Sequence, residues 1–347
     1  MMDQSAEEIR KIQFTGKSTY IISLPKKWVT SHGLNAGSQI IVSQKNGSLI
    51  LTPKEVAKTE TKNFEATLKI SESDDPDIIT RQIISLYLVG YSSIRVLAKD
   101  ERISAAQRNA IKDLVRKKLV GTEIISETPN EIKMQILIGY PEISVESALR
   151  RMCLIAASMH EDAIKALRSL DRNLAQEVVQ LDDEVDRFNL YVIRQLKAAA
   201  QDEKILRDIG LSSPRDCLGY RVIVKSVERI ADHASSIAGN VLLLEEEPNE
   251  EIFQKIMEVS IFAKTVFEDA IKSLFKRDYF MADQVISKAK TISLIESKII
   301  REAQSKVKQT DISNMRMIME SIRRTAEYAS DIAEIVLNLN INQIITA

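Results

Sequence analysis

The second half of the chain contains one segment twice. The stretch "HEDAIKALRSLDRNLAQEV", which begins at His160, aligns with "FEDAIKSLFKRDYFMADQV", which begins at Phe267. Further along, "SVERIADHASSIA" aligns with "SIRRTAEYASDIA", and the second copy has the shorter connection between its two matching stretches. A repeat of this length predicts two copies of one structural unit. We place these copies at 141–247 and 248–340.

Each copy has the apolar spacing of a helical bundle. Apolar residues recur three and four positions apart, which places them on one face of a helix. Two such stripes are Val178, Leu181, Val185, Phe188, Val192 and Ile223, Val227, Ile230, Ala234, Ile237, Val241. With only 10 Gly and 7 Pro, the chain is also suited to long helices. We therefore predict three helices in each copy, which gives tandem three-helix bundles.

Residues 8–54 predict a different module that contains strands. The stretch "STYIISL" is rich in β-branched and aromatic residues, which is typical of a strand. Pro25 then favours the first turn of a short helix that Gly33 closes. Asn46-Gly47 between two apolar stretches predicts a hairpin. A module of about 45 residues buries too little surface to be stable alone, so we expect it to dimerise.

Positive charge is concentrated in this module. The whole chain has a net charge of −1, yet the segment from Ile9 to Lys54 contains no acidic residue. Its basic residues are Arg10, Lys11, Lys17, Lys26, Lys27, Lys45 and Lys54. A basic module on an acidic body is typical of a nucleic-acid-binding protein, although a solubilising surface would have the same composition.

The stretch "RKI…GK…ISLPKKW…GLNAGSQIIV…GSLILTP" resembles the SpoVT/AbrB family of swapped-hairpin transcription regulators. The resemblance implies that two chains interleave their hairpins and present basic residues to DNA. The residues to which it assigns DNA contact are Arg10, Lys11, Lys17, Lys26 and Lys27. Ser18 and Thr19 depart from the family pattern, because many members have a further arginine after the glycine.

Residues 60–140 predict a small α/β domain. Strand-like and helix-like stretches follow one another in the order βαβαββ, which predicts a sheet with helices on one face. Pro76 suits the opening turn of the first helix, and Gly90 suits its end. The basic stretch "RNAIKDLVRKK" is typical of a solvated helix face. We expect a spacer or dimerisation domain.

Four acidic residues accompany the apolar stripes of the first helical copy. They are Asp182, Asp186, Glu228 and Asp232. Each follows a stripe residue by one position, so each pair lies at the rim of a buried helix face, with its members one turn apart. If the two helices pack antiparallel, the four carboxylates converge. Convergent carboxylates repel one another unless a cation lies among them.

Two kinds of cation could neutralise these acids. Arg187 and Arg229 are adjacent in sequence and could form ordinary surface ion pairs. Ligands that are all oxygens instead favour a hard or borderline metal ion such as Mg²⁺, Mn²⁺ or iron. Acid pairs at this spacing are also common on solvated helices, so the spacing alone leaves both interpretations open.

The motifs "LDDEVDRF" and "VERIADHASSIA" resemble the paired E/D-x-x-x-D motifs of the PhoU family of phosphate-uptake regulators, and the tandem repeat is similar to that family's fold. The resemblance implies a metal cluster and a link between phosphate status, transporter activity and gene expression. The implied ligands are Asp182, Asp186, Glu228 and Asp232. The residues that align with them in the second copy are Ala289, Ser293, Arg323 and Glu327. The second copy thus keeps its packing residues and loses most of the acids, so we predict that it binds no metal.

The predicted fold class is mainly α with an α/β N-terminal part. An AbrB-like swapped hairpin at 8–54 precedes a small βαβαββ domain at 60–140. Tandem PhoU three-helix bundles at 141–247 and 248–340 complete the chain.

This organisation predicts a DNA-binding transcriptional regulator of phosphate uptake with a metal-binding sensory body. The expected partners are DNA at phosphate-gene promoters, a second copy of the chain, and a phosphate transporter component. The alternative is a PhoU-type accessory protein that controls a phosphate transporter by direct contact, with an N-terminal module that only dimerises.

An enzyme is not expected. A ferritin-like di-iron site needs Glu three residues before His, and none of His32, His160 and His233 has it. Cys153 and Cys217 lack paired spacing, which suits a reducing cytoplasm. No apolar stretch is long enough to cross a bilayer, and the polar N-terminus is no signal peptide, so we expect a cytoplasmic protein without membrane insertion.

Overall fold

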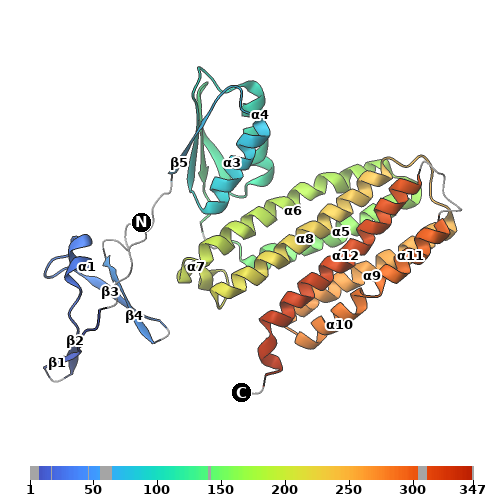
Figure 1. The fold of residues 1–347 in the computed structure, drawn as a ribbon. Coiled ribbons are helices and arrows are strands. Elements are labelled where there is room, and N and C mark those ends of the chain that lie inside the picture. Colours follow the sequence, from blue (N-terminus) through green and yellow to red (C-terminus); the bar gives the residue numbers. More distant parts are fainter. Residues whose placement is uncertain are drawn as a thin grey trace. The chain divides into compact units, whose positions relative to one another are not determined.

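The computed structural model describes residues 8–16, 18–45, 47–54, 65–139, 142–303 and 311–345. The chain divides into two compact units, residues 1–63 and residues 64–347. Figure 1 shows short strands and the short helix α1 in the first unit, and an α/β domain followed by long helices in the second.

The described residues of the first unit include two β-hairpins with a short helix between them. Its elements are β1 (Gln13–Thr15), β2 (Thr19–Ile21), α1 (Lys26–Ser31), β3 (Ile40–Lys45) and β4 (Ser48–Pro53). β1 pairs antiparallel with β2, and β3 pairs antiparallel with β4. The strand expected before Pro25 therefore has a partner, β1, that the sequence did not predict. Lys17 and Asn46 lie outside the described residues.

The first unit has almost no core of its own. Among its described residues, Pro53 is the only one that is buried. In the second hairpin, Val42 lies opposite Leu51 and Leu49 lies opposite Gln44, and all four positions share one face. Val42 and Leu49 are 58% and 66% exposed. This face therefore presents apolar surface that a single chain leaves uncovered.

The second unit begins with a four-stranded sheet and two helices (Figure 1). Its elements are β5 (Glu65–Ile70), α3 (Pro76–Val89), β6 (Ser93–Ala98), α4 (Ala105–Lys118), β7 (Thr122–Glu127) and β8 (Glu131–Ile136). The spatial order is β5-β6-β8-β7, and only β5 and β6 are parallel. Ile132, Met134 and Ile136 are buried at alternate positions of β8, because the helices cover one face of the sheet. The order of strands and helices is the predicted one.

The helical body follows. The first copy contains α5 (Val145–Ser169), α6 (Arg172–Ala199), the short α7 (Glu203–Asp208) and α8 (Pro214–Val241). The second copy contains α9 (Glu250–Lys276), α10 (Tyr279–Ala289), α11 (Ile292–Ala303) and α12 (Ile312–Leu339), and a 3-10 turn at Ile341–Gln343 follows it. The prediction of tandem helical bundles is confirmed, although the second long helix of the second copy is divided into α10 and α11.

The two copies share an unusual backbone conformation at the end of their first long helix. Leu170 and Arg277 occupy aligned positions at the ends of α5 and α9. Both have positive φ, 47° and 54°, which residues other than glycine seldom adopt. Both copies therefore turn the chain in the same way after their first long helix.

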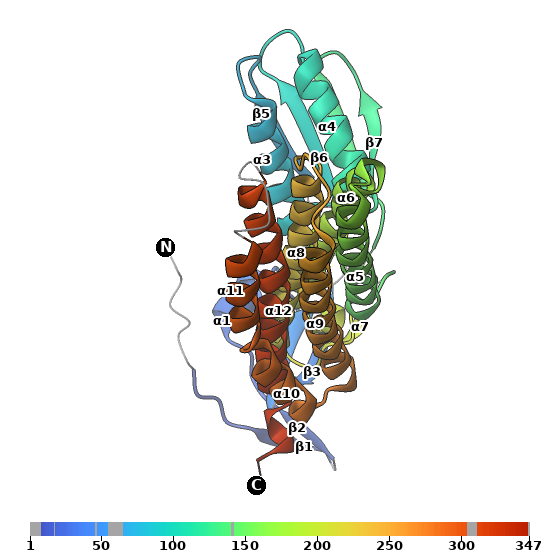
Figure 2. The ribbon, with the colours of Figure 1, turned by 90° about the vertical axis from the view of Figure 1, so that its right-hand side faces the viewer.

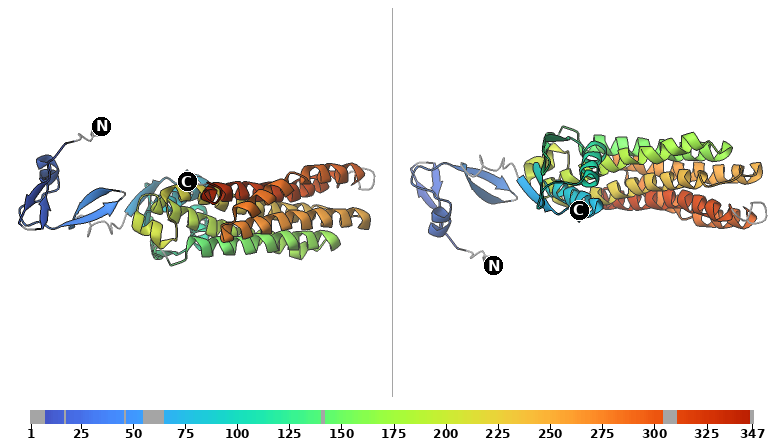
Figure 3. Two further views of the ribbon diagram at one scale, coloured as in Figure 1. Left: turned by 90° about the horizontal axis from the view of Figure 1, so that it is seen from below. Right: turned by 90° about the horizontal axis from the view of Figure 1, so that it is seen from above.

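The two copies share one apolar core. α8 packs against α12, and α5 packs against α9, so helices of different copies are neighbours. Figures 2 and 3 show the long helices of the two copies side by side. A Cβ on Gly219 of α8 would lie 2.9 Å from Cγ2 of Ile335 on α12, so glycine permits this close approach. In the described part of the chain, no helix is both long and apolar enough to span a bilayer.

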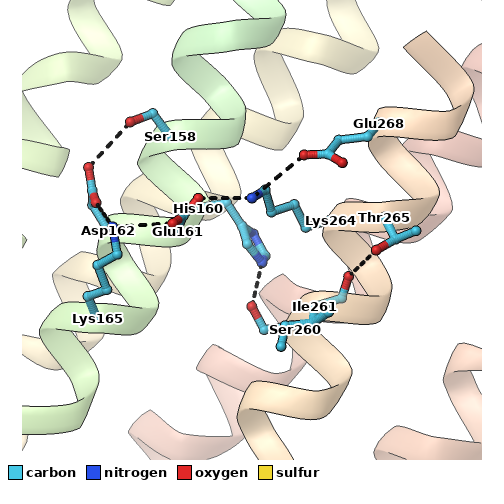
Figure 4. Close-up of polar contacts among 10 residues, drawn as sticks. All are labelled: Ser158, His160, Glu161, Asp162, Lys165, Ser260, Ile261, Lys264, Thr265 and Glu268. Atoms are coloured by element: carbon cyan, nitrogen blue, oxygen red, sulfur yellow. Dashed lines mark hydrogen bonds and ion pairs between the residues drawn. The ribbon is translucent and has the colours of Figure 1, made fainter. Parts of the chain in front are cut away.

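A buried histidine lies where the two copies meet (Figure 4). Nε2 of His160 on α5 is 2.9 Å from Oγ of Ser260 on α9, while Nδ1 has no hydrogen-bond partner among the described residues. Lys264 of α9 pairs with Glu161 of α5 at 2.9 Å across the same interface. Burial lowers the pKa of His160 to about 4, and the positive charge of Lys264 contributes to the shift. The ring is therefore neutral near pH 7.

Replacing His160 by glutamine should make stability less sensitive to acid. The pKa of this histidine is about 4 in the folded protein, against 6.5 in the unfolded chain, so the unfolded chain takes up a proton more readily. Its stabilising contribution is complete above pH 6.5 and is lost as the pH falls toward 4. Between about pH 7.5 and about pH 5, the parent chain should lose about 2 kcal/mol more unfolding free energy than the variant. Denaturant unfolding at both pH values measures this difference, and equal losses would contradict a neutral buried ring.

Candidate functional site

The four acidic residues of the first copy lie on the neighbouring helices α6 and α8. Asp186 of α6 and Glu228 and Asp232 of α8 each offer one carboxylate oxygen, and these three oxygens lie within 4.8 Å of one another. Asp182 precedes Asp186 by one turn of α6. We call these four residues the acid cluster. Acids from two helices thus converge in the structure, while their role as metal ligands stays a prediction.

The acid cluster is only partly open to solvent. Glu228 is 7% exposed, Asp182 and Asp186 are half-buried, and Asp232 is exposed. Desolvation raises the pKa of Asp182 to about 7, and the charge of Asp232 is the next largest cause. The surrounding protein also desolvates Asp232 and raises its pKa to about 6, with the charge of Glu228 adding to the shift. Two carboxyl groups therefore titrate near neutral pH, as crowded acids do when their countercharge is incomplete.

Two lysines form ion pairs with the acid cluster in the described part of the chain. Nζ of Lys118, at the end of α4, lies 2.9 Å from Oδ2 of Asp186. Nζ of Lys225 donates to both carboxylate oxygens of Glu228, three residues further along α8. Two ammonium groups therefore face four carboxyl groups.

The arginines next to the acids in sequence have other surroundings. The guanidinium of Arg229 lies over the ring of Tyr328, 5.4 Å from its centroid. Nε of Arg187 is buried and has no hydrogen-bond partner in the part of the chain that the structure describes. Within the described residues, neither arginine forms an ion pair with the acid cluster. The charge of Arg229 nevertheless opposes the rise in the pKa of Asp232, so this arginine acts on the cluster through its charge and not as an ion-pair partner.

The residues of the acid cluster fit a divalent cation. Each offers carboxylate oxygens, the donors that Mg²⁺, Mn²⁺ and iron accept. Oδ1 of Asp182 is buried without a hydrogen-bond partner among the described residues, which is unfavourable unless something binds to it. The chemistry of the donors and this unpaired oxygen both suit a cation held by Asp186, Glu228 and Asp232, with Asp182 as a further donor.

The equivalent place in the second copy has a different backbone. α6 runs without interruption through Asp182 and Asp186, whereas the division between α10 and α11 falls between the aligned residues Ala289 and Ser293. The two positions therefore no longer lie on adjacent turns of one helix. The second copy has lost the geometry of the pair as well as its carboxylates.

An arginine supplies the cation of the second copy. Arg323 of α12, which aligns with Glu228, forms an ion pair with Glu327 and another at 2.8 Å with Glu296 of α11. Glu327 is the one aligned position that keeps an acid. The positive charge here is a permanent part of the chain, so this position needs no bound metal ion for neutralisation.

The predicted DNA-contact residues belong to the first unit. Lys26 and Lys27 begin α1, and both are exposed. Arg10 and Lys11 lie in the exposed segment before β1, where Arg10 pairs with Glu8. Lys17 lies outside the described residues. Contact of these residues with DNA stays a prediction.

The structure thus defines a protein of tandem helical bundles, with an acid cluster in the first bundle and a separate strand-rich module. A family model described as the PhoU domain matches residues 149–241 and 256–336, which together make up half of the chain and coincide with the two copies. The chain belongs to the PhoU family. The model described as "Antidote-toxin recognition MazE, bacterial antitoxin" matches residues 13–58 of the N-terminal module, which is AbrB-like. Neither match extends over β5–β8.

Similar proteins carry the same family name. A phosphate-specific transport system accessory protein PhoU homolog of Aquifex aeolicus is 28% identical over 174 residues, which cover 49% of this chain and 74% of that protein. The Clostridium acetobutylicum homolog is 21% identical over 206 residues, covering 56% and 90%. The crystal structure of PhoU from Pseudomonas aeruginosa has a TM-score of 0.51 at 22% identity and covers 57% of this chain and 96% of that one. This last likeness concerns the fold.

Proposed function

We propose that this chain is a DNA-binding regulator of phosphate uptake whose helical body responds to a metal ion in the acid cluster. One observation carries the proposal. A PhoU body is joined in the same chain to an AbrB-like module with basic residues and no acid from Ile9 to Lys54. Such a module attracts the phosphates of DNA. The relatives of the whole chain are named as accessory proteins of phosphate-specific transport. These names support phosphate uptake as the process that is regulated.

The missing core of the first unit supports a dimer. Val42 and Leu49 lie on one face of the β3–β4 hairpin and are mostly exposed, and Phe14 and Tyr20 are exposed on the first hairpin. Only Pro53 is buried among the described residues of the unit. The proposed occupant of these faces is a second copy of the module, because each copy would supply the apolar surface that the other lacks.

Charges on the apolar face of the second hairpin should prevent this dimer. In a variant with Val42→Asp and Leu49→Asp, burial of two carboxylates would cost far more than the apolar contact contributes. The matched control is Ser43→Asp with Ser48→Asp, which adds the same charge to the opposite face of the same strands. Multi-angle light scattering should give a dimer or larger assembly for the parent and control chains and a smaller species for the variant. A variant that associates as strongly as its control would place self-association elsewhere.

The alternative function is contact with a phosphate transporter, with a module that only dimerises. The names of the relatives favour this alternative, since they describe accessory proteins of a transport system. A gel-shift assay on the organism's own phosphate-gene promoters separates the two proposals. Specific retardation of promoter DNA by the intact chain supports the regulator, and equal or absent retardation of promoter and unrelated DNA supports the accessory protein. Both proposals are regulatory and involve no catalysis.

A further inference from the structure

The acid cluster receives one of its positive charges from another part of the chain. Lys118 is the last residue of α4 in the α/β domain, and the cluster lies on α6 and α8 of the helical body. Its Nζ lies 2.9 Å from Asp186 and 3.6 Å from Asp183. Partial burial lowers the pKa of Lys118, but the hydrogen bond and charge of Asp186 outweigh this effect and leave the pKa above its usual range. The contact thus joins the α/β domain to the candidate metal site by a charged hydrogen bond.

The backbone after α4 fixes this end of the helix. Val120 is buried in the core of the helical body, and its carbonyl accepts a hydrogen bond from the hydroxyl of Tyr87 on α3. Gly121 has φ of 70°, and a Cβ there would lie 2.3 Å from Cγ1 of Ile138, so only glycine fits. The chain therefore brings Lys118 to α6 through a tightly constrained turn.

A second contact between the same two parts joins a buried arginine to backbone carbonyl oxygens. Arg194, two turns further along α6, is 6% exposed and donates to the carbonyl oxygens of Tyr87 and Gly90 at the end of α3. This contact does not involve the acid cluster. The side chains of Lys118 and Arg194 thus both connect the α/β domain with α6, and of these two contacts only that of Lys118 depends on the charge of the cluster.

The cation that neutralises the acids of the second copy comes from the helical body, unlike Lys118. This cation, Arg323, belongs to α12 itself and is paired with acids on α11 and α12. That charge thus belongs to the helical body itself. Lys118, by comparison, belongs to a different domain and reaches the acid cluster from outside, with 36% of its side chain exposed.

We propose that Lys118 is a replaceable cation of the acid cluster, and that a divalent metal ion and the Lys118 ammonium group occupy the cluster in turn. This inference rests on the proposed metal site. Repulsion between an ammonium group and a dication within roughly 5 Å exceeds the strength of a partly exposed ion pair, so binding of the metal ion displaces the lysine. The end of α4 is then held less tightly to α6, while Arg194 still holds the end of α3. Metal binding is in this way transmitted to the domain whose first strand, β5, follows the N-terminal module along the chain.

Two measurements on the intact chain with MnCl₂ test this inference. The first is the rate of lysine acetylation, followed by mass spectrometry with and without Mn²⁺. The rate at Lys118 should rise at least roughly threefold with Mn²⁺, because the released amine is no longer held by Asp186. Lys117, which is exposed and adjacent, is the internal reference and should not change.

The second measurement is calorimetric titration of Mn²⁺ into single variants. Lys118→Gln should bind Mn²⁺ roughly threefold to tenfold more tightly than the parent, because no ammonium group competes. Lys117→Gln is the matched control and should bind as the parent does. The inference is wrong, and the metal site stands, if the parent binds Mn²⁺ but two results are negative. These are an acetylation rate at Lys118 that Mn²⁺ does not change, and a Lys118→Gln variant that binds Mn²⁺ no more tightly than the parent. If the parent binds no Mn²⁺, the proposed metal site itself fails and the inference fails with it.

Discussion

A chain with Asp186→Asn and Asp232→Asn should lose metal binding and remain folded. These two residues supply one carboxylate from each of the helices α6 and α8 to the acid cluster. Amide oxygens lack the negative charge that holds a divalent cation, so we expect the affinity for Mn²⁺ to fall by at least roughly a hundredfold. Without metal, the variant should be at least as stable as the parent, because it relieves repulsion among the carboxylates. Calorimetric titration and thermal unfolding measure the two effects.

The matched control for this prediction is Glu327→Gln. Glu327 occupies the position of the second copy that aligns with Asp232, and it pairs with Arg323. Its replacement should leave the metal content of the chain unchanged. Elemental analysis of the parent and both variants, after incubation with Mg²⁺, Mn²⁺ or Fe²⁺, shows which copy holds the metal ion. Equal loss of metal in both variants would mean that the second copy also holds a site, and no metal in the parent would mean that neither does.

The second large effect concerns DNA. Lys26→Glu with Lys27→Glu reverses two exposed charges at the start of α1, and thus four in a dimer. Each lysine that neutralises one phosphate contributes about −0.9 to the slope of log affinity against log salt. Loss of four such contacts should make that slope shallower by roughly 3 to 4 and weaken binding at low salt by several orders of magnitude. Fluorescence anisotropy of labelled DNA at several salt concentrations measures both quantities.

The control for charge alone is Lys204→Glu with Arg207→Glu. Both residues are exposed on α7 in the second unit, and the change in net charge is the same. This control should bind DNA with nearly the parent affinity. Circular dichroism should be unchanged for both double variants. If the two weaken binding equally, the long-range charge of the chain, rather than α1, determines its affinity for DNA.

The sequence predicted the helical body well because its signals are local and occur twice. Residues such as Val227 and Ile230 recur at helical spacing and are fully buried in the structure. The break between α10 and α11 was not predicted, because Lys290 and Thr291 are ordinary residues without a helix-breaking signal. The sharing of one core by both copies also depends on contacts between distant helices.

In the acid cluster, contacts that follow from spacing along a helix could be predicted, and contacts that depend on packing between domains could not. Spacing alone placed Asp186, Glu228 and Asp232 on two helix faces that could meet, and they do meet. The pairing of Lys225 with Glu228 could also have been predicted from their separation of three residues on one helix. Lys118 could not, because it lies in another domain and only the packing of α4 against α6 brings it to Asp186.

If the proposed function is right, metal in the acid cluster alters binding of promoter DNA by the intact chain. The most direct measurement is fluorescence anisotropy on a promoter fragment of the organism's phosphate genes, with and without Mn²⁺. The parent chain and the variant with Asp186→Asn and Asp232→Asn are compared. We expect Mn²⁺ to change the affinity of the parent for the promoter and to leave that of the variant unchanged. The proposed function is wrong if the parent binds promoter and unrelated DNA equally, or if Mn²⁺ changes the affinity of neither chain or of both chains alike.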